Sequence, residues 1–580
     1  MLKPLSRAVA TALAAALVAT TTASHAQNQA PAYRPGLLDY ETIQHPVHAD
    51  RAMVVSQNVI ASQVGADILR RGGNAVDAAV ATAFALAVTL PRAGNLGGDG
   101  YMLVHIGATD ETIVIDYRSI APLAAHPALF SAAQGGNPDD VRRGYRASGV
   151  PGTVAGMEAA HRRWGRLPWA ELVAPARRLA QEGVILSRDE AGGLVWSREM
   201  WEPYEAGRRA FLKEDGSAYA AGDLFVQADL GWTLEQIEQH GAAAFYSGAV
   251  ADRIAASMTR NGGLITREDL AAYRPVFRQP IEADYRGYRV VTTPPSSSGG
   301  VMLLEMLNIV ENFDLGGAGA GTAASLHWMA EAMKLAQLDR TRWIGDPDFS
   351  DIPTDQLVSQ AFADRRSQLI RPDAVLASAD LHPLDPWAVE GENTTHFSVV
   401  DGDGNVVANT YTLGSSYGSG AVIDGAGFLL NDQMKNFSRR MGADGRPLRA
   451  NGMEPRKRMI STMSPTIVFR DGQPWLVTGT PGGSTIPNTL FQIIVNMIDH
   501  DMNVAQATHA PRIHQDGASG RLQAEPGFNG DTAALLEQRG HSMGRRTTIG
   551  SSQSIVILPE GGLEGAADSR RPDAAAVPAD

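Results

Sequence analysis

The chain has 580 residues, 44% of them hydrophobic and 19% charged, a composition typical of a globular protein with a large core. It contains no cysteine, which excludes a disulfide scaffold, a thiolate metal site and a cysteine nucleophile. The formal net charge of −13 argues against nucleic acid or an anionic membrane surface as a partner, because both need a basic surface, and favours a small-molecule substrate.

The first 26 residues predict a signal peptide. Lys3 and Arg7 precede an apolar run over residues 8–19, and Ser24 and Ala26 supply the small residues that signal peptidase needs. The run is too short to cross a bilayer comfortably, and no later segment approaches eighteen uninterrupted apolar residues. We therefore expect residues 1–26 to be removed, and the mature protein to be periplasmic or secreted and to have no membrane span.

Two helices and a pair of strands are predicted next. Residues 59–71 carry apolar side chains at helical spacing, and Asn74 is a good N-cap for a second, alanine-rich helix. The runs 101–106 and 112–117 read as paired strands. The glycine-rich segment 94–100 before them matches neither a P-loop nor a dinucleotide fingerprint, so backbone packing explains it better than phosphate binding.

A mainly helical segment, residues 150–390, leads into two strand hairpins. The first hairpin pairs residues 395–400 with 406–413 across a turn rich in Asp and Gly. The second sets residues 466–470 against 475–479.

The last long helix is predicted from about Ile486 to Ile498, and residues from Arg570 onward are expected to form a loose tail. Strand hairpins between long helices predict a mixed α/β body in which sheets lie between helical layers.

One local feature has chemical interest: a polar loop enters a strand at Asn393-Thr394-Thr395-His396. Threonine is common in strands, so this motif means little by itself. Several other stretches accompany it, namely Thr412, 461–466, 478–484, 72–79, 116–122, 148–152 and 339–349. Together they make the chain resemble the γ-glutamyltranspeptidase family of N-terminal nucleophile hydrolases, from about Met53 to about Asp568.

The resemblance implies a four-layer αββα sandwich and a self-processing precursor. Cleavage between Asn393 and Thr394 would leave a large subunit, 27–393, and a small subunit, 394–580, associated as a heterodimer. Thr394 would then be the nucleophile, and its freed α-amine, with a reference pKa of about 7.7–8.0, would be the base. The expected reaction is hydrolysis or transfer of γ-glutamyl or glutaryl-type amides, glutathione-like compounds among them, through an acyl-Thr394 intermediate.

The resemblance also assigns the other site residues. Thr412 would orient the nucleophile, and the backbone amides of Gly482 and Gly483 would form the oxyanion hole. The residues expected to bind substrate are Arg118 and the hydroxyl pair Ser461 and Thr462 at the α-carboxylate, together with Gln433 and Asn436.

Three positions depart from the family pattern. Thr462 stands in place of a second serine, and Gly414 lacks the Asn or carboxylate side chain usual there. Asn436 replaces the aspartate that binds the donor's α-ammonium. A hydrogen bond to a charged group contributes about 1.5–3 kcal/mol, so we expect a weaker preference for α-amino donors and an acylase-like acceptance of glutaryl amides.

Two other hypotheses are open. Gly414-Ser415-Ser416-Tyr417-Gly418 fits Gly-x-Ser-x-Gly, which allows an α/β-hydrolase with Ser416 as nucleophile, although the residues that follow resemble turn and strand rather than helix. A catalytically silent periplasmic binding protein is the other. No cofactor or metal is expected, because the histidines are scattered along the chain and His396 reads as a strand residue.

Overall fold

The computed structural model describes residues 42–376, 393–440, 449–517 and 520–580. The expected signal peptide, 1–26, and the approach to the expected cleavage site, 377–392, lie outside the described residues. The chain divides into two units, 1–45 and 46–580, and the fold below is that of the second. Within the described residues, no helix combines the length and apolar character that a membrane crossing requires.

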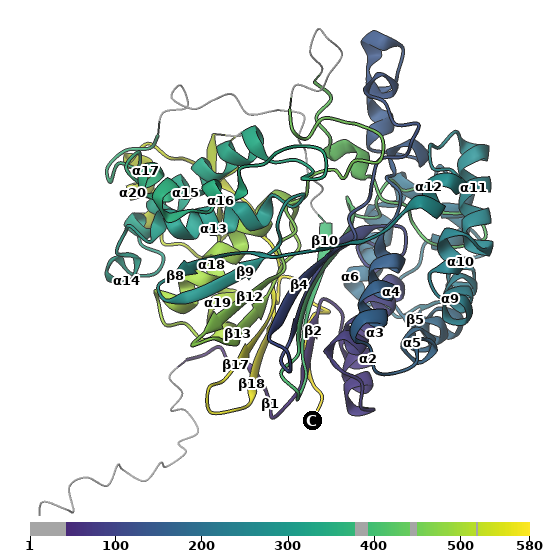
Figure 1. Cartoon of the computed structure of the whole chain (residues 1–580), viewed down its shortest axis with the longest axis horizontal. Coiled ribbons are helices and arrows are strands. Elements are labelled where there is room, and N and C mark those ends of the chain that lie inside the picture. The colour runs from purple at the N-terminus through teal and green to yellow at the C-terminus, as the bar shows by residue number, and fades with distance from the viewer. Residues whose placement is uncertain (1–41, 377–392, 441–448, 518–519) are drawn as a thin grey trace, which may run out of the picture. The chain divides into compact units, whose positions relative to one another are not determined.

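Two seven-stranded antiparallel sheets form the centre of this unit (Figure 1). The first has the order β19-β2-β10-β11-β3-β4-β7 and the second β1-β18-β17-β13-β12-β9-β8. The strands of the first sheet are β2 (Met53–Ser56), β3 (Asp99–Ile106), β4 (Glu111–Asp116), β7 (Val276–Arg278), β10 (Asn393–Val400), β11 (Val406–Gly414) and β19 (Ala575–Pro578). Those of the second are β1 (Val47–Ala49), β8 (Ile281–Tyr285), β9 (Tyr288–Thr292), β12 (Thr466–Arg470), β13 (Gln473–Thr478), β17 (Gln553–Ile557) and β18 (Leu563–Ala567).

Helices cover the outer face of each sheet (Figure 1). On the side of the first sheet they are α2 (Val59–Arg70), α3 (Ala75–Thr89), α4 (Thr153–Trp164), α5 (Trp169–Glu182), α6 (Arg188–Trp196), α7 (Arg198–Trp201), α8 (Glu205–Phe211), α9 (Ala228–His240), α10 (Ala243–Tyr246), α11 (Ala249–Asn261) and α12 (Arg267–Ala272). On the side of the second they are α13 (Gly299–Val310), α14 (Leu315–Ala318), α15 (Ala323–Trp343), α16 (Thr354–Leu357), α17 (Gln360–Ser367), α18 (Ile486–Ile498), α19 (Val504–His509) and α20 (Gly530–Gln538). Short 3-10 turns and small sheets complete the unit: η1 (Pro127–Phe130), η2 (Ala132–Gln134), η3 (Pro138–Val141), η4 (Tyr145–Ala147), η6 (Gln433–Asn436), η7 (Gly483–Thr485), β5 (Val184–Ile185), β6 (Leu224–Phe225), β14 (Ile513–His514), β15 (Arg521–Ala524) and β16 (Ser542–Arg545).

The alternation of side chains along each strand builds the layers. On β3, Met102 and Val104 belong to the core shared with α3 and α5. Their neighbours Tyr101 and Leu103 point the other way, into the core shared with the second sheet and with α13 and α18. Because both faces are apolar, the first sheet is buried between helices and a second sheet, which gives the expected αββα sandwich.

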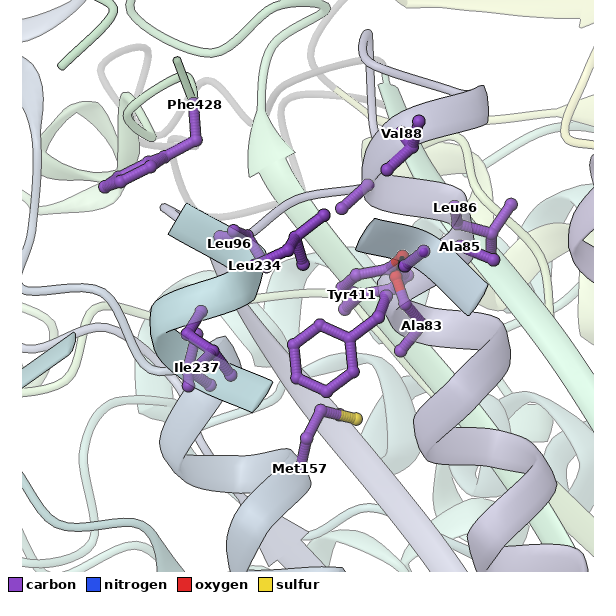
Figure 2. Packing of buried hydrophobic residues seen from close by; sticks show 14 of the residues in the cluster. Ala83, Ala85, Leu86, Val88, Leu96, Met157, Leu234, Ile237, Tyr411 and Phe428 are labelled. Carbon is purple, nitrogen blue, oxygen red and sulfur yellow. Dashed lines mark hydrogen bonds between the residues drawn. The ribbon is translucent and has the colours of Figure 1, made fainter. Parts of the chain in front are cut away.

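Helix α3 is buried on every side. Asn74 caps it in a capping box with Asp77, as its sequence predicts. Its small side chains let the first sheet approach closely, and the Tyr411 hydroxyl on β11 donates to the Ala83 carbonyl at 2.9 Å (Figure 2). This contact fixes β11, a strand of the candidate site, against the helical layer.

The expectation that residues 150–390 are mainly helical is confirmed over the described residues 150–376, which also contain β7, an edge of the first sheet, and β8 and β9, at one end of the second. One expectation about the fold is wrong. The C-terminal tail is not loose, because β19 pairs with β2 and Arg570 forms ion pairs with Glu525 at 2.5 Å and Asp568 at 3.1 Å. β19 pairs with a strand distant in sequence, which local patterns do not reveal.

Candidate active site

Thr394 lies at the start of β10, where the strand pairing is irregular. Asn393 pairs with Gly414 and Thr395 with Tyr411, so two residues of β11, Thr412 and Leu413, oppose Thr394 alone. Such a bulge re-aims side chains locally. The Thr394 hydroxyl lies 3.2 Å from that of Thr412, which in turn accepts the Gly414 amide at 2.8 Å.

A small pocket opens beside this pair. It brings together all the residues that the sequence predicted for catalysis and substrate binding except Gly482, which directly precedes the lining residue Gly483. The lining residues are Arg118, Thr394, Thr412, Gly414, Gln433, Asn436, Ser461, Thr462, Met463, Gly483 and Ile486. They come from segments throughout the chain, and β10 and β11 place the Thr394 hydroxyl among them.

The turn between β13 and α18 presents two glycines. Gly482 has φ +134° and Gly483 has φ +57°, conformations that a residue with a side chain rarely adopts. Among the described residues, neither glycine amide donates to another protein group, whereas the Gly483 carbonyl accepts the Thr462 hydroxyl at 2.7 Å. The turn η7 then leads directly into α18, whose positive end lies beside Ile486 at the pocket.

A buried ion pair holds the cationic wall. Arg118 is 1% exposed and its Nη1 donates to Asp99, which is fully buried, at 2.5 Å. Its Nη2 donates to Gln433 Oε1 at 2.9 Å, and its Nε to the Met459 carbonyl at 3.1 Å. The guanidinium is therefore fixed rigidly at the pocket wall, with Asp99 behind it.

Two amide side chains adjoin Arg118 in the pocket lining. Asn436 donates through Nδ2 to Gln433 Oε1 at 2.8 Å, and both side chains line the pocket on η6. Arg118 is the one charged residue among the described residues of the lining, and no carboxylate is in that set. The pocket therefore presents the Arg118 guanidinium, with Asp99 paired behind it, and hydrogen-bonding groups.

Gly414 cannot simply be replaced by a larger residue. Its φ is +98°, and a Cβ there would lie 2.0 Å from Asp432 Oδ1. The absence of a side chain at position 414 thus leaves the space that Asp432 Oδ1 occupies.

The glycine-rich segment near residue 97 packs backbone against backbone. A Cβ on Gly97 would lie 2.1 Å from the Leu429 carbonyl oxygen, and one on Gly98 would lie 2.1 Å from that of Thr412. The packing interpretation is therefore confirmed, and the segment supports the strand that carries Thr412.

Ser416 does not lie in a nucleophile elbow. β11 ends at Gly414, and residues 415–420 form bends and turns with no helix after them. An α/β-hydrolase needs a helix directly behind the serine, so the structure contradicts this alternative.

No histidine of the described residues lines the pocket. Burial lowers the pKa of His396 to about 3, and its ring nitrogens bond the hydroxyls of Thr410 at 2.8 Å and Ser398 at 3.0 Å. The histidines are less scattered than the sequence suggests, because His327 and His541 lie 2.8 Å apart beside Glu331. Lys334 already neutralises Glu331 at 2.7 Å, and this cluster shares no residue with the pocket.

Sequence reasoning missed some supporting residues. Asp99, between glycines, anchors Arg118, and an acid inside a glycine-rich turn is the one signal that could have pointed to it. Ser298 fixes the Ser461 carbonyl with its amide and its hydroxyl, each at 2.7 Å, and no local pattern marks it. Met463 and Ile486 supply apolar lining.

The chain is similar in sequence and structure to several known proteins. The family model described as gamma-glutamyltranspeptidase matches residues 61–578. The glutathione hydrolase proenzyme of Escherichia coli (strain K12) is 45% identical, over 92% of this chain and 93% of its own length. The acylase ACY 1 proenzyme of Pseudomonas sp. (strain SE83) is 35% identical, over 93% of this chain and 95% of its own. A crystal structure of cephalosporin acylase from Bacillus halodurans matches with a TM-score of 0.83 at 30% identity, covering 95% of this chain and 99% of that one.

Proposed function

The chain belongs to the gamma-glutamyltranspeptidase family, as an N-terminal nucleophile amidohydrolase, and we propose that it cleaves itself before Thr394 and then hydrolyses glutaryl-type amides in preference to γ-glutamyl ones. The names of its relatives support the first part, since glutathione hydrolase and acylase ACY 1 are both described as proenzymes. A proenzyme of this class yields two subunits from one chain.

Processing uses the hydroxyl already placed in the bulge. The Thr394 oxygen attacks the Asn393 carbonyl carbon, and the peptide C–N bond breaks as an ester forms. Water then opens the ester, which leaves a carboxylate on Asn393 and a free α-amine on Thr394. That amine, with a reference pKa of about 7.7–8.0, is a base at neutral pH.

Turnover follows the same path. The α-amine takes the Thr394 hydroxyl proton as the oxygen attacks the donor amide carbon, and the amides of Gly482 and Gly483 stabilise the resulting oxyanion. The proton passes to the leaving amine, and an acyl ester remains on Thr394. Water releases the acid, or a second amine takes the acyl group. Thr412 keeps the hydroxyl in position at 3.2 Å.

The proposed preference for glutaryl donors rests on the charged groups of the pocket lining. Arg118 supplies a cation for a donor carboxylate, with Ser461 and Thr462 close by in the same pocket. An α-ammonium would need a carboxylate, and position 436 offers an amide instead. A glutaryl group has the distal carboxylate and lacks the ammonium, so it matches this set of groups. Hydrolysis of γ-glutamyl amides is the competing outcome.

Three matched anilides test the proposal on the purified, processed enzyme. The γ-glutamyl and glutaryl anilides differ only in the α-amino group, and butyryl anilide lacks the carboxylate as well. We expect kcat/KM to be highest for glutaryl anilide and lowest for butyryl anilide. A large preference for γ-glutamyl anilide would overturn the glutaryl assignment and leave the family membership intact.

A further inference from the structure

A buried ion pair lies directly behind the pocket wall at Gly414. Lys435 is 4% exposed and Asp432 1%, and Lys435 Nζ lies 2.6 Å from Asp432 Oδ2. The same ammonium donates to Ser415 Oγ at 2.5 Å. The other oxygen, Oδ1, accepts the Ser415 amide at 2.9 Å. Both oxygens of Asp432 are thus directed at groups beside Gly414 and Ser415.

This cluster adjoins the donor site on two sides. Gly414 is a lining residue, and the space where its Cβ would be is taken by Asp432 Oδ1, 2.0 Å away. Lys435 lies on η6 between Gln433 and Asn436, whose side chains line the pocket. Asp432 is therefore a carboxylate immediately behind the wall, and Lys435 neutralises it.

We propose that Lys435 is a specificity-determining positioning residue that holds and neutralises Asp432, so that this carboxylate cannot act as a counter-charge for a donor α-ammonium. The inference deepens the proposed function and rests on it. Position 436 carries an uncharged amide in place of one possible counter-charge. The second possible counter-charge, the Asp432 carboxylate, is neutralised by its ion pair with Lys435. The Gly414 side of the pocket then contributes no net charge, and the Arg118 guanidinium, paired with Asp99 behind it, is the ionic group that faces the donor.

Removing the charge of Lys435 and removing the charge of Asp432 should shift the donor preference in opposite directions. Without Lys435, the Asp432 carboxylate is unneutralised next to the pocket, and a donor ammonium is favoured. Without the Asp432 charge, the Lys435 ammonium is unneutralised, and a donor ammonium is repelled. A charge in a poorly screened position several ångströms from the ligand changes binding by about tenfold.

The readout is the ratio of kcat/KM for γ-glutamyl anilide to that for glutaryl anilide, because a general loss of activity cancels in the ratio. We expect Lys435→Met to raise it about tenfold and Asp432→Asn to lower it by a similar factor. The double variant, which removes both charges, should return the ratio close to that of the parent protein. Lys435→Arg keeps the positive charge and should leave the ratio near the parent value.

Self-processing and the melting temperature of each variant report on folding. If Lys435→Met does not fold, the nearly isosteric Asp432→Asn still tests whether the ratio shifts in the expected direction. Shifts in the same direction for both single variants, or no shift in either, would overturn the inference. A parent enzyme that prefers γ-glutamyl anilide would refute the proposed function alone, since the opposite shifts of the two variants could still be measured from that starting ratio.

Discussion

The hydroxyls of Thr394 and Thr412 lie 3.2 Å apart across the bulge between β10 and β11. We propose that Thr412 limits the rotation of the Thr394 hydroxyl, the nucleophile of the proposed function.

Thr412→Val keeps the shape of the side chain and removes its hydroxyl. We expect both self-processing and kcat to fall about ten- to a hundredfold, because an oriented hydrogen bond to the nucleophile is lost and the Gly414 amide loses its acceptor. Time courses of precursor cleavage and steady-state kinetics measure both rates. Thr412→Ser retains the hydroxyl and should recover most of the activity, and an active, fully processed Thr412→Val protein would contradict the assigned role.

Gly482→Ala tests whether the turn at Gly482 and Gly483 stabilises the oxyanion. The residue has φ +134°, a conformation that residues with a side chain rarely adopt, and a Cβ would lie 2.2 Å from Thr485 Oγ1, so the backbone or the Thr485 side chain must shift. The loss of an oxyanion donor typically costs about 10²–10³ in kcat, and we expect a decrease of that size with KM little changed.

Gly472→Ala is the matched control for this prediction. Gly472 also has positive φ, +79°, but lies in the β12–β13 turn with open space around its Cβ position. It should lower the melting temperature slightly and leave kcat unchanged. An unaltered kcat in Gly482→Ala would show that this turn does not stabilise the transition state.

Asn436→Asp places a carboxylate in the pocket lining. A hydrogen bond to a charged group contributes about 1.5–3 kcal/mol, so the γ-glutamyl to glutaryl ratio of kcat/KM should rise about ten- to a hundredfold. Asn529→Asp adds the same charge at the exposed N-cap of α20, where Asp also caps well, and should leave the ratio unchanged. An unchanged ratio in Asn436→Asp would exclude position 436 as a reader of the α-substituent.

His396 predicts how stability depends on pH. Burial lowers its pKa to about 3, whereas an unfolded chain binds the proton near pH 6.5. Below pH 6.5 the His396 imidazole binds a proton in the unfolded state but stays neutral in the folded state. The contribution of His396 to the free energy of unfolding therefore falls as the pH drops from 6.5 towards 3. Between pH 7.5 and pH 5 the loss is about 2 kcal/mol.

Urea unfolding of a single-chain Thr394→Ala precursor, with and without His396→Gln, measures this contribution without subunit dissociation. The glutamine variant should show a shallower decline of stability with falling pH, and His240→Gln, at the exposed end of α9, should show the parent slope. Equal slopes in the His396→Gln and parent proteins would contradict the buried, neutral state of His396.

Much of the fold could be predicted where the pattern is local. The helix Ile486–Ile498 and both hairpins have the expected bounds within a residue or two, because apolar periodicity and Asp-Gly turns determine them. Strand β9 was missed, since besides its hairpin with β8 it pairs with β12, which is distant in sequence. β19 was missed for the same reason, its partner β2 lying at the other end of the chain.

The sequence predicted which residues line the candidate site, but not most of the hydrogen-bond partners that hold them in place. Thr394, Gly483 and Arg118 could be named because they belong to motifs shared with a family. The partners that hold them, such as Asp99 behind Arg118, come from separate segments that only the fold brings together. For Gly414 the sequence shows a missing side chain, and only the structure shows that Asp432 occupies its place.

The intact mass of the purified protein, with N-terminal sequencing of its chains, decides whether Thr394 is a self-generated nucleophile. We expect two chains, the smaller beginning at Thr394, and a single uncut chain in the Thr394→Ala variant. A parent protein that stays one uncut chain on long incubation while hydrolysing its substrate, or that is cut at another bond, would contradict Thr394 as the self-generated nucleophile.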